Sequence, residues 1–239
     1  IGLGASGPIV VKNWHSQAFD KPMTRTREAV EIIQLALSGE RVDYEGACFR
    51  LEGFRMLIRP IQDRIPIYLA TLKSRAVRQT GEIADGWLPT HVSVRNIEAS
   101  RAPLVAGANA AGRDPLEIDM AALTLVACSD DGETARALCR EHLAYYIGGM
   151  GTFYHELMHG YGYGDVADRI QSTWRNGNRA GAADVIPRDV LDDLVVAGNR
   201  AECLAAIEAR REAGISHLVV FPPHNVSPEL FATTIEAIA

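Results

Sequence analysis

The sequence lacks the features that would set it apart from ordinary globular proteins. No apolar run approaches the roughly 20 residues that a helix needs to span a bilayer, and no signal peptide opens the chain. Acidic residues outnumber basic ones by 30 to 24 in 239 residues, so a basic face for nucleic acid is not expected. Hydrophobic residues make up 47% of the chain, which excludes disorder as its main state. We therefore expect a cytoplasmic protein with neither a nucleic-acid nor a membrane partner.

Cysteine is also scarce. The four cysteines are irregularly spaced and form no C-x-x-C pair: Cys48, Cys128, Cys139 and Cys203. An even count leaves two disulfides open as an alternative. The favoured interpretation is reduced and mostly buried thiols, as in a cytoplasmic protein.

Short apolar segments alternate with amphipathic helices along much of the chain. The pattern predicts strands at residues 1–4, 65–70, 85–89, 118–128 and 217–221, with helices at 24–37, 74–84, 95–111, 201–212 and 226–238. Continuously apolar strands that alternate with helices are typical of a parallel α/β fold. A barrel and an open sheet both fit, because a complete (β/α)₈ barrel needs about 250 residues and eight strands. Residues 131–197 show helical patterns without a convincing strand, which predicts a helical insertion before the last strand.

The most conspicuous motif is His155-Glu156-Leu157-Met158-His159. In such an H-E-x-x-H helix, two imidazoles one turn apart bind zinc and the glutamate acts as general base. Gly162 and Asp165 extend the motif, with Asp165 in the position of a third ligand. No methionine follows Met158, so the Met turn of metzincin proteases is missing. A zinc metalloprotease is kept as a remote alternative to a surface helix with two solvated histidines.

A second constellation follows the strand at 65–70. There the chain runs through Thr71-Leu72-Lys73-Ser74-Arg75 into a helix, with Ser74 as candidate cap. Free backbone N–H groups and the helix dipole favour an anion at such a helix start. Hydroxyl groups of Thr71 and Ser74 and the charges of Lys73 and Arg75 would add to it. The alternative is an ordinary turn that binds nothing.

A third constellation lies near the beginning of the sequence. Gly2-Leu3-Gly4-Ala5-Ser6-Gly7-Pro8 places small residues after a strand, where a ligand can approach the backbone closely. Trp14 could stack on a planar ring, and His15 could move a proton. The alternative is a tight turn, with Trp14 in the core and His15 in a partly exposed loop.

Taken together, these residues resemble the luciferase-like monooxygenase superfamily, and in particular its coenzyme F420-dependent oxidoreductases. The resemblance runs from Ile1 to about Phe221. It is carried by six segments: Gly2–Pro8 with Trp14-His15, Arg25–Glu28, Ile65–Ala70, Glu82–Pro89, Tyr146–Gly151 and Arg211–Ile215.

The resemblance implies a (β/α)₈ TIM barrel of the luciferase-like type. It also implies that the chain is a single domain over 1–239 that lacks about the first three of the eight strands, with Ile1 in strand four. A homodimer is a further implication. The family places the helix with His155 and His159 in the insertion and implies no metal there.

The resemblance also implies a cofactor and a reaction. The loop Gly4-Ala5-Ser6-Gly7 would approach the cofactor, and the turn Ala70-Thr71-Leu72-Lys73 with Ser74 would hold its phosphate. This sequence departs from its relatives at Lys73-Ser74, where they often have Gly-Pro. The expected chemistry is hydride transfer between coenzyme F420 and an unidentified small organic substrate, with Trp14 and His15 as substrate-side catalytic candidates. An FMN-dependent monooxygenase is the close alternative, and a fragment without activity of its own is another.

Overall fold

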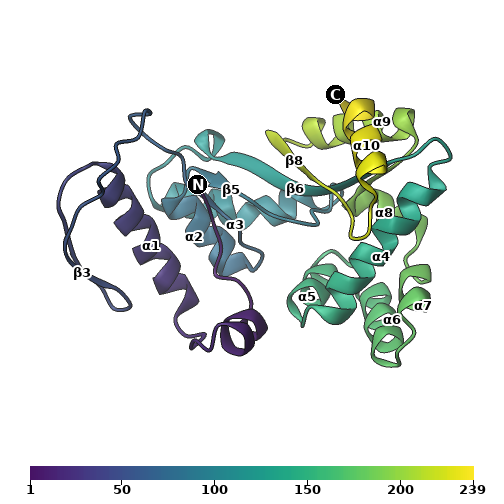
Figure 1. Cartoon of the computed structure of the whole chain (residues 1–239), viewed down its shortest axis with the longest axis horizontal. Helices are drawn as coiled ribbons and strands as arrows, with labels where there is room; N and C mark the ends of the chain where they lie inside the picture. Colours follow the sequence, from purple (N-terminus) through teal and green to yellow (C-terminus); the bar gives the residue numbers. More distant parts are fainter. The chain divides into compact units, whose positions relative to one another are not determined.

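The computed structural model describes residues 1–239, and the chain divides into two compact units (Figure 1). Unit 1 comprises residues 1–88 and 101–119, and unit 2 comprises residues 89–100 and 120–239. None of the helices combines the length and the apolar character needed to cross a membrane.

Unit 1 is built on three short parallel strands. These are β1 (Gly2–Leu3), β4 (Tyr68–Leu69) and β5 (Gly86–Trp87), and β4 pairs with both of the others. Helices α1 (Pro22–Leu37) and α2 (Ser74–Ile83) belong to this unit, as does α3 (Ile97–Ala110) from residue 101 onward. Buried Val30, Ile67, Leu69 and Ala84 form its core. The core thus fixes β4, whose end carries one of the predicted cofactor segments.

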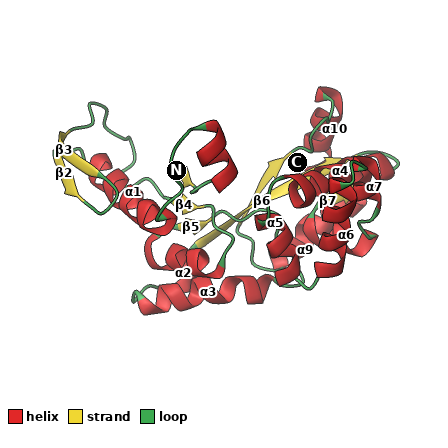
Figure 2. Ribbon diagram, turned by 90° about the horizontal axis from the view of Figure 1, so that it is seen from below, coloured by secondary structure: helices red, strands yellow, loops and turns green.

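Glycines allow α2 and α3 to cross at backbone distance. A Cβ at Gly81 would lie 2.0 Å from the carbonyl oxygen of Leu104, and one at Gly107 would lie 1.9 Å from that of Arg78. Any larger residue would therefore push the two helices apart. The two helices lie side by side in Figure 2. This close contact fixes the position of α2, which begins at the second predicted cofactor segment.

An antiparallel pair, β2 (Val42–Glu45) and β3 (Arg50–Phe54), is attached to α1 by a buried carboxylate. Glu28 accepts hydrogen bonds from the backbone N–H groups of Ala47, Cys48 and Phe49. Burial alone would raise the pKa of Glu28, but the three donors outweigh it and lower that pKa. The turn of the pair is therefore held by an ionised side chain.

Unit 2 is also built on a parallel sheet. Strand β6 (Asp119–Cys128) pairs with β7 (Val196–Gly198) and with β8 (His217–Phe221). The helices of this unit are α4 (Glu133–Gly149), α5 (Phe153–Gly160), α6 (Gly164–Arg175), α7 (Arg179–Asp184), α8 (Arg188–Leu194), α9 (Arg200–Glu212) and α10 (Pro228–Ile238), and the first five of them surround a large apolar core. Residues of α4 to α8 supply most of that core.

The structure confirms the predicted alternation of parallel strands and helices. It also confirms that the cysteines are free thiols and that all of them except Cys48 are buried. Helix α9 begins at the expected capping box, in which the side chain of Asn199 accepts from the N–H of Glu202 and the Glu202 carboxylate accepts from the N–H of Asn199.

Two predictions about local structure are wrong. Residues 131–197 were expected to contain no strand, but Val196 begins the three-residue strand β7, so the helical insertion lies between β6 and β7 and not directly before the last strand. Ser74 is the first residue of α2 and does not cap it; Lys73, with an extended backbone, occupies the cap position, and no side-chain hydrogen bond caps the helix. The single domain over 1–239 stays a prediction.

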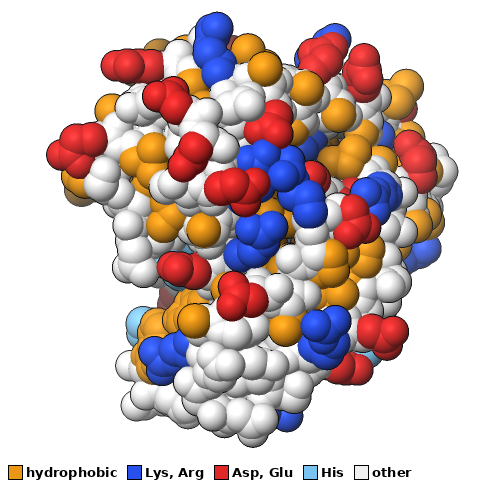
Figure 3. Space-filling view, turned by 90° about the vertical axis from the view of Figure 1, so that its right-hand side faces the viewer, with side chains coloured by type: hydrophobic (Ala, Val, Ile, Leu, Met, Phe, Trp, Pro, Cys, Tyr) orange, Lys and Arg blue, Asp and Glu red, His pale blue; other side chains and the backbone are white.

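Charges of both signs are mixed on the surface. Figure 3 shows one face of the molecule, on which acidic and basic side chains are interspersed. In unit 2, the guanidinium of Arg188 contacts carboxylates of Glu133, Asp192 and Glu202. On this face, basic and acidic side chains thus lie next to one another.

Candidate functional site

The two segments predicted to bind a cofactor are adjacent in unit 1. The N–H of Ala70 donates to the carbonyl of Leu3 over 2.7 Å, which joins the ends of β1 and β4. A Cβ at Gly4 would lie 3.3 Å from the Cβ of Ala70, so the two backbones are in close contact. Loop 4–7 and turn 70–74 therefore meet at the carboxyl ends of two parallel strands, where α/β proteins bind ligands.

Turn 70–74 leads into the ten-residue helix α2, and exposed residues of the turn lie at and next to the start of this helix. Ala70, Lys73 and Ser74 are exposed, and Thr71 and Leu72 are half-buried. Backbone N–H groups in the first turn of a helix have no acceptor within the helix. The N–H of Ala76 already donates to the carbonyl of Lys73, so with no side-chain cap on α2 the N–H groups of Ser74 and Arg75 and the Ser74 hydroxyl form the donor set suited to an anion.

Thr71 has a different role from the one predicted for its hydroxyl. That hydroxyl lies 2.9 Å from the hydroxyl of Thr80, which itself donates to the carbonyl of Ala76. Because a hydroxyl has one proton, Thr71 must be the donor in the shared hydrogen bond. Its carbonyl also accepts from the indole N–H of Trp87. Thr71 therefore fixes the shape of the turn, and Ser74 retains the free hydroxyl.

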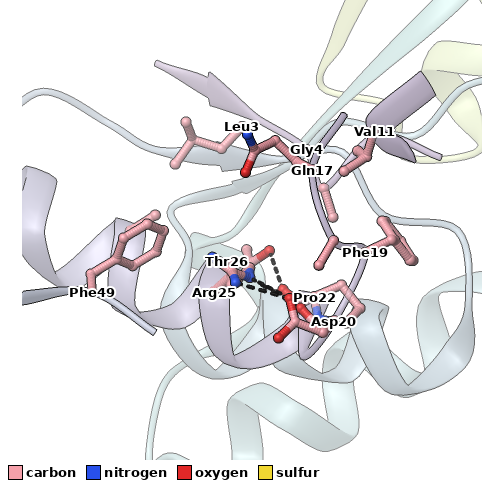
Figure 4. Close-up of a pocket in the computed structure, with 13 residues that line it drawn as sticks. Leu3, Gly4, Val11, Gln17, Phe19, Asp20, Pro22, Arg25, Thr26 and Phe49 are labelled. Atoms are coloured by element: carbon pink, nitrogen blue, oxygen red, sulfur yellow. Dashed lines mark hydrogen bonds and ion pairs between the residues drawn. The ribbon is translucent and has the colours of Figure 1, made fainter. Parts of the chain in front are cut away.

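A cavity of about 360 Å³ borders the first of these segments (Figure 4). Leu3, Gly4 and Ala5 form one wall, and the other walls come from residues 11–29 and from Phe49. Such a volume falls in the range of small-molecule pockets, which is roughly 300–1,000 Å³. The cavity thus lies against the loop that was predicted to approach the cofactor.

An ion pair provides the charged groups of this cavity. The guanidinium of Arg25 contacts the carboxylate of Asp20 at 2.9 Å, and its Cζ lies 5.7 Å from the centre of the Phe49 ring. The hydrogen bond from Arg25 lowers the pKa of Asp20. Both side chains are labelled in Figure 4, and the remaining labelled lining is mostly apolar. The cavity therefore suits a largely apolar molecule with a polar group near the ion pair.

The two predicted catalytic residues, Trp14 and His15, lie on a short π-helix (Val10–Trp14) and directly after it. Trp14 is 68% exposed, so the alternative that it belongs to the core is wrong. His15 is exposed as well. Neither lines the cavity, to which the same segment contributes Val11 and Gln17. A substrate-side role for Trp14 and His15 stays a prediction.

The histidines of the H-E-x-x-H motif converge on an aspartate of the next helix. The Nε2 atoms of His155 and His159 lie 2.7 and 3.0 Å from Oδ1 of Asp168. These hydrogen bonds lower the pKa of Asp168. Asp165, the expected third member, is not part of the group whose ligand atoms lie within 4.8 Å of one another. The prediction of Asp165 as the third member is therefore wrong, because Asp168 is the acidic residue that lies beside the two histidines.

Sequence reasoning missed a buried histidine cluster in unit 2. His91 is 4% exposed, and neither of its ring nitrogens has a hydrogen-bond partner. Its ring centre lies 6.0 Å from that of His142 and 5.1 and 5.5 Å from those of Tyr146 and Tyr154. His142 stacks on Tyr146, and its Nδ1 accepts from the N–H of His224. Burial lowers the pKa of His91 to about 4. Burial is also the main reason why the pKa of His142 is lowered to about 3, so both imidazoles are neutral.

A buried carboxylate ties the residues around this region together. Asp193 is 5% exposed and accepts from the hydroxyls of Ser93 and Tyr163 and from the N–H of Arg95. The buried guanidinium of Arg210 donates to the carbonyls of residues 192, 193 and 195. These hydrogen bonds fix the end of α8 at the start of β7, and no motif in the sequence indicated them.

Residues 1–217 match the family model described as luciferase-like monooxygenase, and the chain belongs to this family. It is 31% identical over 238 residues to a Mycobacterium tuberculosis protein that carries the name coenzyme F420-dependent oxidoreductase Rv3520c. That alignment covers 92% of this chain and 69% of the relative. It is 25% identical over 212 residues to the 5,10-methylenetetrahydromethanopterin reductase of Methanolobus tindarius, covering 89% of this chain and 64% of the relative. The chain thus spans about two thirds of the length of these relatives.

Solved structures show the same fold. The coenzyme F420-dependent tetrahydromethanopterin reductase of Methanopyrus kandleri matches with a TM-score of 0.81 at 24% identity, over 100% of this chain and 71% of that one. An F420-dependent secondary alcohol dehydrogenase matches with a TM-score of 0.72 at 17% identity, over 100% and 69%. A type II Baeyer-Villiger monooxygenase of Pseudomonas putida, in complex with FMN, matches with a TM-score of 0.59 at 16% identity, over 99% and 68%. The predicted α/β fold of the luciferase-like type is confirmed.

Proposed function

We propose that this chain is part of an oxidoreductase that transfers a hydride between coenzyme F420 and a small organic substrate. The observation that carries the proposal is the meeting of loop 4–7 with turn 70–74 at the carboxyl ends of β1 and β4. The F420-dependent names of the relatives support this cofactor. The FMN complex among the more distant structures keeps FMN as the alternative.

The residues at this place fit a phosphate-bearing cofactor. The donor set at the start of α2 suits a phosphate, and Gly4 and Ala5 leave their side of the loop free of bulky side chains. When bound, coenzyme F420 would supply the hydride chemistry, at C5 of its deazaflavin ring. The residues of this chain would bind and orient it and keep water away from it.

Six of the nine predicted cofactor residues then have a defined task. The backbone of Gly4, Ala5, Ser6 and Gly7 would lie against the cofactor. Ser74 would hold its phosphate together with the N–H groups of the first turn of α2, while Thr71 keeps the turn in shape through its hydrogen bonds to Thr80 and Trp87. The cavity beside Leu3 would take an apolar part of the substrate or cofactor.

A side-by-side titration with coenzyme F420 and FMN tests this proposal. With fluorescence as the readout, we expect saturable binding of F420. Its dissociation constant should be lower than that of FMN. Tighter binding of FMN would favour the monooxygenase alternative. Absence of binding to either cofactor by the folded chain would contradict the proposed function.

A further inference from the structure

We propose that His155, His159 and Asp168 form a binding site for a divalent transition-metal ion, and Zn²⁺ is the ion used to test it. The site joins α5 to α6 within the helical insertion. It is independent of the proposed oxidoreductase function, because all three residues belong to unit 2 and the cofactor segments belong to unit 1.

The geometry supports three ligands on one ion. Both imidazoles use Nε2, and these atoms lie 2.7 and 3.0 Å from the same carboxylate oxygen. All three ligand atoms lie within 4.8 Å of one another. Ligand atoms of one tetrahedral zinc, with bonds of about 2.0–2.1 Å, are separated by about 3.3 Å. Small side-chain rotations would therefore bring the three atoms into the first coordination sphere of zinc, with a fourth position open to water.

The chain holds the three side chains in place before any ion binds. His155 and His159 are one turn apart on α5, and their ring centres lie 4.7 Å apart. The short connection between α5 and α6 turns at Gly162, whose φ of +82° suits glycine. This turn returns α6 alongside α5, so that Asp168 faces the two rings. Binding would thus need little ordering of the backbone.

The ligand set selects the kind of ion. Imidazole nitrogen and one carboxylate oxygen suit zinc and its transition-metal neighbours, whereas calcium and magnesium prefer sites made entirely of oxygen. The side chains of His159 and Asp168 are 46% and 59% exposed, so an ion from solvent can reach them. The rival interpretation is a metal-free cluster in which the aspartate only accepts hydrogen bonds from the two histidines.

Zinc titration of the tag-free chain by calorimetry separates the two interpretations, with metal content measured after gel filtration. We expect about one equivalent of Zn²⁺, and at least about tenfold weaker binding in His159→Ala and in Asp168→Asn, because each removes one ligand. Asp165→Asn on the same helix and His217→Ala on β8 are the matched controls and should bind zinc as the unsubstituted chain does. Calcium should not compete.

Three results would overturn the proposal. The first is that no zinc binds at roughly 100 µM, and the second is that the zinc affinity is unchanged in both ligand substitutions. The third is that zinc binding is lost in Asp165→Asn and kept in Asp168→Asn. Far-UV circular dichroism of each variant verifies that the helices are intact. Binding of coenzyme F420 should be the same in His159→Ala and in the unsubstituted chain. A failure of F420 binding in both would count against the proposed function and leave the zinc result unaffected.

Discussion

The burial of His91 and His142 should make the stability of the protein depend on pH. The pKa of His91 is about 4 in the folded chain, against an ordinary value of 6.5. Above pH 6.5 the imidazole is neutral whether the chain is folded or unfolded. Between pH 6.5 and 4 the unfolded chain binds a proton that the folded chain excludes, so acid favours unfolding. His142 acts in the same direction.

The size of the effect follows from the difference between the two pKa values. Each pH unit below 6.5 should lower the free energy of unfolding by about 1.4 kcal/mol for His91 alone, and by about 3 kcal/mol in total at pH 4. Urea unfolding at several pH values between 7 and 4, followed by far-UV circular dichroism, measures this slope. The slope of the unsubstituted chain should be steeper than His91 alone would give, because His142 adds to it.

The variant His91→Asn tests the assignment. Asparagine does not titrate and tolerates the left-handed backbone at this position, where φ is +51°. It should be less stable than the unsubstituted chain at pH 7, and its stability should fall about half as steeply with acid. His217→Asn, which removes an exposed imidazole, is the control and should keep the full slope. An undiminished slope in His91→Asn would refute the reasoning.

Two further predictions concern stability. Gly81→Ala should lower the free energy of unfolding by about 2–3 kcal/mol in denaturant titration, because the added Cβ would meet a backbone oxygen of α3. The control Gly160→Ala, whose added Cβ would have no atom within 4 Å, should change this free energy by less than about 0.5 kcal/mol. Equal effects of the two substitutions would contradict the helix crossing at Gly81. Asp193→Ala should cost about 3 kcal/mol in thermal unfolding, since it removes the shared acceptor of the Ser93 and Tyr163 hydroxyls, and a loss below about 1 kcal/mol would show that the carboxylate does not hold these segments.

Local patterns predicted much of the fold. The helices and most strands follow from the spacing of apolar residues, and the start of α9 follows from Asn199 and Glu202, which are three residues apart. Strand β7 was missed because it has three residues and begins two positions after the last residue of a helix. The cap of α2 was misplaced by one position, since Ser74 suits both the cap and the first turn.

Contacts between distant residues could not be predicted in this way. Asp165 and Asp168 both follow the two histidines closely, and only the path of the turn between α5 and α6 decides which of them faces the rings. The buried His91 and His142 and the exposed His224, whose ring contacts that of His142, are connected by no local motif. By contrast, the pairing of β1 with β4 brought together two segments that the sequence had already singled out.

The central claim is that the cofactor lies on loop 4–7 and at the start of α2. Its most direct test is the dissociation constant of coenzyme F420 for the unsubstituted chain, Ser74→Glu and Ser74→Ala. A glutamate in the first turn suits the helix dipole, so the fold should persist, but its charge should repel a phosphate and weaken binding by at least about tenfold. Ser74→Ala should weaken binding less. Equal affinity in all three proteins would contradict the placement of the cofactor.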